Sequence, residues 1–203
     1  MVYDRRGFGA APRRGDPGLD LFDEGQRDLA ALIERLGGDP VHLVGHSDGG
    51  TIALLLAARR PDLTRSVAVI AAHARADPIT IGTLQAMGPP RRWAEPLRNS
   101  LQRTHGDDWE EVAAGWHRLW TSSAWSDWSI EGDLPHIHCP LLVVHDRRDP
   151  LSPPLHAETI AAAVAGATTL WTDTSSHDPH RHQQAEVEAA LARLWRAAET
   201  AAP

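Results

Sequence analysis

A small-residue turn between an apolar run and an Ala- and Leu-rich segment constrains the fold of this chain most strongly. Residues 45–49 read Gly-His-Ser-Asp-Gly, which matches the Gly-x-Ser-x-Gly spacing of a nucleophile elbow. Residues 41–44 before it predict a short buried strand, and residues 51–60 after it predict a helix. Because the elbow turns sharply, we expect larger side chains at Gly45 and Gly49 to collide with neighbouring backbone.

The serine at the centre of this turn, Ser47, is the candidate nucleophile. The turn raises its hydroxyl to a position that a histidine can reach. It also places Ser47 at the N-terminus of a helix, where backbone N–H groups favour developing negative charge. The alternative interpretation is a glycine-rich turn that only happens to contain a serine.

The length and charge of the chain limit its number of domains and the kinds of partner it can bind. A chain of 203 residues predicts one domain with an inserted subdomain. The formal charge of −7 argues against nucleic acid or an anionic membrane as the main partner. The chain contains neither a long apolar stretch nor the apolar core of a signal peptide at residues 1–6, and its single cysteine, Cys139, excludes an internal disulfide. These features predict a cytoplasmic protein.

The types and spacing of the ionisable residues predict no cofactor and no metal site. All 20 basic residues are arginines, which excludes a Schiff-base mechanism on lysine. The 12 histidines are scattered, without a His-Glu-x-x-His pair or a Cys/His cluster.

Apolar segments alternate along the chain in the manner of an α/β protein. Strands that alternate with helices predict a parallel sheet covered on both faces. The expected strands are the end of one at Val2-Tyr3, then 41–45, 66–71, 141–145 and 168–172; the expected helices are 19–36, 51–60, 154–164 and 183–198.

Residues 73–135 interrupt this alternation and contain six of the eight tryptophans. We expect a helical lid there, inserted into a core made of residues 1–72 and 136–203. Trp116 and Trp120 share one helical face and are candidate substrate-binding residues that would form an apolar ceiling over the site. The alternative is that the tryptophans only pack the lid onto the core.

Two polar loops follow predicted strands and supply a candidate acid and base for Ser47. Asp149 follows strand 141–145, and His177 follows strand 168–172. Since parallel strands end at the same edge of a sheet, both groups are expected on the side of the elbow. A serine, an acid and a histidine in this order along the chain match one known arrangement of a catalytic triad.

These motifs together resemble the α/β-hydrolase fold, in particular its lidded esterases and carbon–carbon bond hydrolases. The matching segments run from end to end: Asp-Arg-Arg-Gly-Phe-Gly at 4–9, Gly-His-Ser-Asp-Gly-Gly at 45–50, Cys-Pro at 139–140, Arg-Asp-Pro at 148–150 and Ser-His-x-x-His at 176–180. The resemblance implies that Ser47 is the nucleophile, His177 the general base and then acid, and Asp149 its orienting carboxylate. It also implies that the backbone N–H of Asp48 is one oxyanion donor.

Other assignments remain open beside these. Asp146 is an alternative acid, although the family usually has glycine there, and His180 is an alternative base. His46 is expected to line the substrate site and to pack or form a hydrogen bond. Arg5 and Arg6 are expected to form salt bridges rather than to bind substrate.

The resemblance also implies a segment that precedes Met1 in the family, with earlier strands and a His-Gly loop carrying the second oxyanion donor. A misassigned start, a fragment of a longer protein and a truly short chain would each explain the difference. In the last case, direct strand pairing or a partner subunit would close the sheet. Exposed strand edges therefore predict a possible homo-oligomer.

The expected function is hydrolysis of a small carboxylic ester, or a related acyl compound, through an acyl-enzyme on Ser47. One rival is a metal-free haloperoxidase-like reaction with the same triad. Another is a non-catalytic or degenerate hydrolase fold that only binds a ligand.

Overall fold

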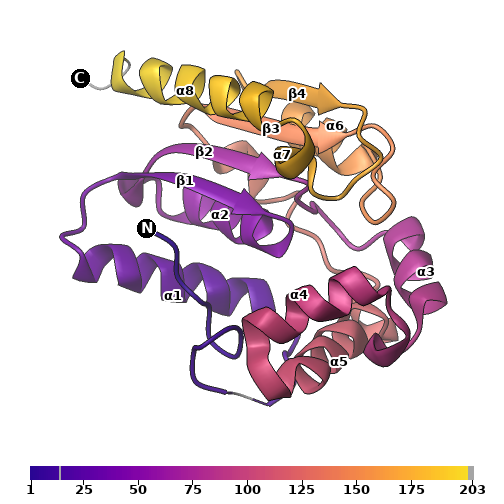
Figure 1. The fold of residues 1–203 in the computed structure, drawn as a ribbon. Coiled ribbons are helices and arrows are strands. Elements are labelled where there is room, and N and C mark those ends of the chain that lie inside the picture. Colours follow the sequence, from indigo (N-terminus) through magenta and orange to yellow (C-terminus); the bar gives the residue numbers. More distant parts are fainter. Residues whose placement is uncertain (14, 201–203) are drawn as a thin grey trace.

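The computed structural model describes residues 1–13 and 15–200, and its central feature is a parallel sheet (Figure 1). In the described residues the sheet has four strands in the order β1-β2-β3-β4. The strands are β1 (Val41–His46), β2 (Thr64–Ile70), β3 (Leu141–Asp146) and β4 (Thr168–Thr172). His46 pairs with Ile70, and Asp146 pairs with Thr172, so the strand ends align at one edge. The predicted α/β class and parallel sheet are confirmed.

Helices cover both faces of this sheet, as the continuous apolar runs of the strands predict. On one face, α2 (Asp48–Arg59) packs on β1 and β2, α1 (Leu21–Arg35) packs on α2, and α6 (Leu155–Ala163) packs on β3. On the other face lies α8 (Gln184–Thr200) (Figure 1). Successive residues of β2 alternate between the two cores: Val67 and Val69 belong to the larger one, whereas Ala68 and Ile70 pack beside residues of α8.

Three further helices lie together near the carboxyl ends of the strands: α3 (Pro78–Met87), α4 (Glu95–His105) and α5 (Trp109–Trp120) (Figure 1). They occupy the segment for which the sequence predicts a helical lid. The extended structure described within it is an isolated antiparallel bridge between Arg75 and Ser129. Beyond β4, the short helix α7 (Pro179–His182) leads into α8. Among the described helices, none combines the length and the apolar character that crossing a membrane requires.

The N-terminal segment differs from its predicted structure. The strand expected to end at Val2-Tyr3 is wrong, because residues 1–5 form no strand. Met1 and Val2 are 86% and 96% exposed and have no strand pairing that would hold them extended. As a result β1 is an outer strand, with no strand on its other side among the described residues. Association through this edge stays a prediction.

Candidate active site

The turn between β1 and α2 has the geometry expected of a nucleophile elbow. β1 ends at His46 and α2 begins at Asp48, so Ser47 alone makes the turn. Its backbone has φ 53° and ψ −125°, a conformation that side-chain-bearing residues rarely adopt. A hydrogen bond of 2.8 Å from the Ser47 N–H to the Ile70 carbonyl holds this strained residue beside β2. The helix therefore starts three residues earlier than predicted, directly after the strained serine.

Close backbone packing explains only one of the two glycines in the Gly-x-Ser-x-Gly pattern. A Cβ atom at Gly45 would lie 2.3 Å from the carbonyl oxygen of Gly49, a distance that no rearrangement of a side chain relieves. A Cβ atom at Gly49 would meet no atom within 4 Å. The expected collision at Gly49 is therefore wrong. The second close approach is at Gly50, where a Cβ would lie 2.8 Å from the Cβ of Ala72 on the segment after β2.

Ser47, His177 and Asp149 form one continuous hydrogen-bonded chain. The Ser47 hydroxyl lies 3.0 Å from Nε2 of His177, and Nδ1 of His177 lies 2.8 Å from Oδ2 of Asp149. Because an ionised carboxylate only accepts hydrogen bonds, Nδ1 carries the proton of a neutral His177. Nε2 is then free to accept the Ser47 proton, as a general base must.

The carboxylate of Asp149 is fixed by the loop that follows it. Its side chain is buried, and its second oxygen, Oδ1, accepts hydrogen bonds from the backbone N–H groups of Leu151 and Ser152 at 2.8 and 3.0 Å. Both carboxylate oxygens thus have partners, which offsets the cost of burying the charge. The arrangement leaves Oδ2 pointed at His177 and holds the imidazole in one orientation.

Asp146, the alternative acid, has a different set of partners. This buried carboxylate accepts hydrogen bonds from the hydroxyl groups of Thr172 and Thr174 and from backbone N–H groups of residues 148, 174 and 175. Burial alone would raise its pKa, but the hydrogen bonds from Thr174, Arg148 and Thr172 outweigh burial and lower the pKa to about 2. Asp146 therefore ties the loop after β3 to the loop that carries His177, and it makes no hydrogen bond to His177 itself.

His46 and His180 lie beside the triad rather than in it. Nε2 of His46 donates a hydrogen bond of 2.8 Å to the backbone carbonyl of His177. Burial, then the neighbouring His177, lowers the pKa of His46, so its ring is neutral near pH 7. The ring of His180 lies 5.0 Å from that of His46, and no hydrogen bond joins it to Ser47 in the described structure. Geometry thus favours His177 over His180 as the base.

The residue after the nucleophile, Asp48, is held by two side chains from distant segments. Its Oδ2 accepts hydrogen bonds from Nη2 of Arg5 at 2.7 Å and from the indole N–H of Trp116 at 2.9 Å. The expected salt bridges of Arg5 and Arg6 are confirmed, the second one to Asp28. The backbone N–H of Asp48, at the first turn of α2, has no acceptor among the described residues. It is therefore free to stabilise an oxyanion.

A cavity of about 890 Å³ opens beside Ser47. Ser47, His46 and Trp116 line it, together with apolar residues of α1 and β1 and the N-terminal segment. Trp120 does not line it. This side chain is fully buried and packs against Phe22, Trp116 and three other aromatic rings, so the structure places Trp120 in the core instead of over the substrate. The spacing of Trp116 and Trp120 predicts a shared helix face, but not which part of that face is covered.

The sequence does not predict one polar cluster that lies near Ser47, His177 and Asp149. The ring of His73 is buried 6.1 Å from that of His177, and neither of its nitrogens has a partner in the described residues. Burial, then neighbouring His156, holds the pKa of His73 well below its usual value. His156 in turn lies 2.9 Å from Asp77, a buried carboxylate. The only available signal was the position of His73 just after a strand, on the triad side of the sheet.

Comparison with known proteins agrees with this fold. Residues 1–190 match the model of the Alpha/beta hydrolase family. The chain is 28% identical to "Serine hydrolase BPHL" of Mus musculus over 194 residues, which cover 89% of this chain and 63% of that protein. The chain thus spans less than two thirds of the length of this relative.

Solved structures show the same fold at lower sequence identity. NosK from Streptomyces actuosus superposes with a TM-score of 0.74 at 22% identity, covering 95% of this chain and 83% of that one. Proline iminopeptidase of Mycobacterium smegmatis gives 0.69 at 20% identity, covering 98% and 80%. Because the family match spans nearly the whole chain, this chain belongs to the alpha/beta hydrolase family.

Proposed function

We propose that this protein is a serine hydrolase that cleaves a small carboxylic ester, or a related acyl compound such as a thioester, an amide or a β-diketone. The observation that carries the proposal is the chain of hydrogen bonds from Ser47 through His177 to Asp149, at 3.0 and 2.8 Å. A nucleophile, a base and an orienting carboxylate in this arrangement are what acyl transfer requires.

In the proposed reaction, Oγ of Ser47 attacks the substrate carbonyl while its proton passes to Nε2 of His177. The backbone N–H of Asp48 stabilises the negative oxygen of the tetrahedral intermediate. His177 then gives the proton to the leaving group, and an acyl-enzyme remains on Ser47. A water molecule, deprotonated by the same nitrogen, releases the acid. Asp149 stabilises the imidazolium at each step without taking its proton.

The cavity supports a small substrate with an apolar acyl group. Its volume of about 890 Å³ is typical of sites for small molecules. Leu29 and Ile33 of α1 and Val41 of β1 form part of its wall, and Trp116 adds an aromatic surface near Ser47. "Serine hydrolase" in the printed name of the mouse relative supports the same class of reaction.

Hydrolysis of p-nitrophenyl acetate and butyrate tests this proposal directly. Ser47→Ala and His177→Ala are each expected to lower turnover by at least about 10³-fold without lowering the melting temperature by more than a few degrees. His180→Ala, the matched histidine outside the hydrogen-bonded chain, is expected to retain most of the activity. If Ser47→Ala keeps wild-type turnover, Ser47 is not the nucleophile, whereas absence of turnover in the wild type would make a ligand-binding role the better account.

A further inference from the structure

Beside His177, three potential metal ligands converge from two distant parts of the chain. His46 comes from the elbow, and Asp178 and His180 come from the segment around α7. The ligand atoms of these three side chains all lie within 4.8 Å of one another. Because His46 is more than 130 residues from the others, the histidine spacing that argues against a metal site could not reveal this cluster.

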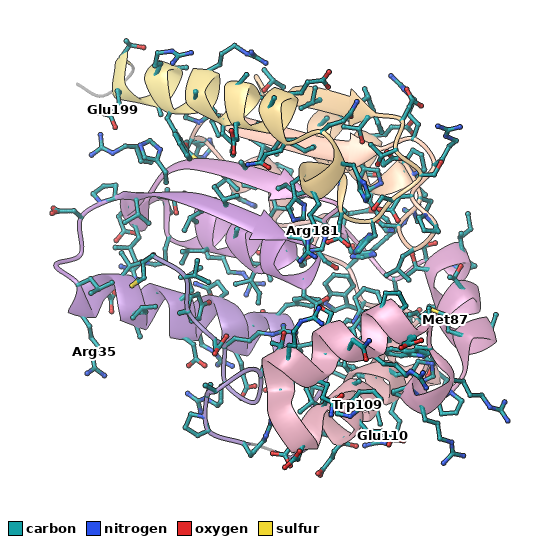
Figure 2. All side chains as sticks on the ribbon, in the orientation of Figure 1. Arg35, Met87, Trp109, Glu110, Arg181 and Glu199 are labelled. Atoms are coloured by element: carbon teal, nitrogen blue, oxygen red, sulfur yellow. The ribbon has the colours of Figure 1, made fainter. Side chains whose placement is uncertain are left out.

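Among the described residues, the side chains of Asp178 and His180 make no hydrogen bond, whereas His46 donates one to the His177 carbonyl. Each of the three is half-buried. Nδ1 of His180 is buried and has no hydrogen-bond partner in the described residues. Oδ1 of Asp178 lies 3.7 Å from Nε2 of His46 and 3.7 Å from Nε of Arg181, too far for a hydrogen bond in either case. Arg181, labelled in Figure 2, is 69% exposed and is therefore free to turn away from the carboxylate.

The chemistry of this cluster suits a transition-metal ion. Two imidazoles and one carboxylate, with water in the fourth position, make a common tetrahedral zinc set. Ligand atoms at zinc lie about 3.4 Å apart, as follows from zinc–ligand bonds of about 2.1 Å in a tetrahedron. Small side-chain rotations would close the present separations to that value.

We propose that His46, Asp178 and His180 bind one divalent transition-metal ion, with zinc as the best fit, and that the bound ion slows the reaction of Ser47. The second part rests on the proposed hydrolase function. Its reason is the hydrogen bond of 2.8 Å that Nε2 of His46 donates to the His177 carbonyl. Nε2 is also the ring nitrogen of His46 that faces Asp178, 3.7 Å from its Oδ1. Once an ion takes this nitrogen, the ring carries its proton on Nδ1 instead, and the hydrogen bond to the His177 carbonyl is lost.

Loss of this bond affects His177 because this proposed base and two of the proposed metal ligands lie on one short segment. His177 directly precedes Asp178, and His180 follows two residues later. Drawing Asp178 and His180 toward a metal, while releasing the His177 carbonyl, displaces the imidazole from its place 3.0 Å from Ser47. General-base catalysis depends steeply on that placement.

Calorimetric titration of the tag-free protein with zinc sulfate tests the binding site, and the visible absorption of cobalt(II) tests its geometry. The wild-type protein is expected to bind one ion in a tetrahedral site. Asp178→Asn, which preserves shape, and His180→Ala are each expected to weaken binding by at least about ten-fold. His182→Ala is the matched control, since His182 is an exposed histidine on the same short helix. Absence of binding, or equal weakening in the control, would overturn the site.

The rate at which a fluorophosphonate labels Ser47, with and without zinc, tests the inhibitory part. Zinc is expected to slow labelling of the wild type and of His182→Ala, but not of His180→Ala. Equal slowing in all three would show that zinc acts elsewhere and would overturn inhibition through this cluster. Absence of labelling even without zinc would overturn both the proposed hydrolase function and its inhibition, whereas calorimetry alone decides whether the metal site exists.

Discussion

Asp146 and Asp149 lie three residues apart on one loop, and their partners separate their roles. Asp149 directs one oxygen at His177 and satisfies the other with backbone N–H groups. Both carboxylate oxygens of Asp146 accept hydrogen bonds, from the hydroxyl groups of Thr172 and Thr174 and from neighbouring backbone N–H groups. In the proposed reaction the first carboxylate acts on His177, and the second only holds the loops in place.

Replacing each aspartate with asparagine should separate chemistry from stability. Asp149→Asn should lower kcat by about 10⁴-fold, because an amide can hold the wrong tautomer of His177. Asp146→Asn should instead lower the free energy of unfolding by about 2–3 kcal/mol and cost less activity. Turnover of p-nitrophenyl acetate and urea unfolding measure the two effects. Greater damage to kcat from Asp146→Asn would move the acid to Asp146.

The elbow glycines should also respond differently to the same small substitution. Gly45→Ala places a methyl group against the Gly49 carbonyl oxygen at 2.3 Å, so we expect severe loss of both folding and activity. Gly49→Ala meets open space on α2 and should be neutral, or stabilising by up to about 1 kcal/mol. Melting temperatures of the two variants check this. A destabilised Gly49→Ala would restore the requirement for glycine at both positions.

Two of the three tryptophans of α5, Trp116 and Trp120, lie in different environments. Trp116 reaches the cavity and donates its indole N–H to Asp48, whereas Trp120 is enclosed by other aromatic side chains. Their spacing of four residues puts them on the same face, and the rings lie 5.7 Å apart. The helix therefore joins the cavity wall to the core through one aromatic contact.

Alanine at position 116 should change the preference among substrates, whereas alanine at position 120 should change the stability of the protein. Trp116→Ala should weaken kcat/KM for butyrate more than for acetate, by roughly 1–3 kcal/mol in transition-state binding. Trp120→Ala should lower stability by about 3–5 kcal/mol and leave the ratio of the two substrates unchanged. Equal, length-independent losses in both variants would mean that Trp116 only packs α5 onto the elbow.

Local sequence patterns predict the helices and strands well, because each strand is a short apolar run and each helix has an apolar face. Strand 168–172 has its predicted bounds, and the other three strands of the sheet differ from theirs by at most two residues at either end. The loops after β3 and β4 meet the elbow as expected, since parallel strands end at one edge. The triad geometry follows from that topology.

Contacts between distant segments were not predictable in the same way. The close approach of Gly50 to Ala72, the burial of Trp120 and the meeting of His46 with Asp178 all depend on how loops and helices pack, which no short pattern encodes. The strand expected at Val2-Tyr3 failed for the same reason. Its residues have suitable propensity, but they have no strand beside them to pair with.

Stability of the whole molecule should decline in acid partly through Asp146. Its pKa is about 2 in the folded protein, below the value of about 3.9 for an unfolded aspartate, so its contribution is complete above about pH 4 and fades toward pH 2. The shift corresponds to about 2.5 kcal/mol. The difference in unfolding free energy between wild type and Asp146→Asn should therefore shrink as the pH falls through this range. A constant difference in urea titrations would contradict the assigned pKa.

Intact-protein mass spectrometry after exposure to a fluorophosphonate tests the central claim, that the fold activates Ser47 as a nucleophile. The folded chain should gain a single adduct, and peptide mapping should place it on Ser47. Ser47→Ala and the urea-unfolded wild type should gain none, and His177→Ala should react far more slowly, since activation requires the assembled hydrogen-bonded chain. An unlabelled folded wild type, or an adduct that persists in Ser47→Ala, would contradict the assignment of Ser47 as the activated nucleophile.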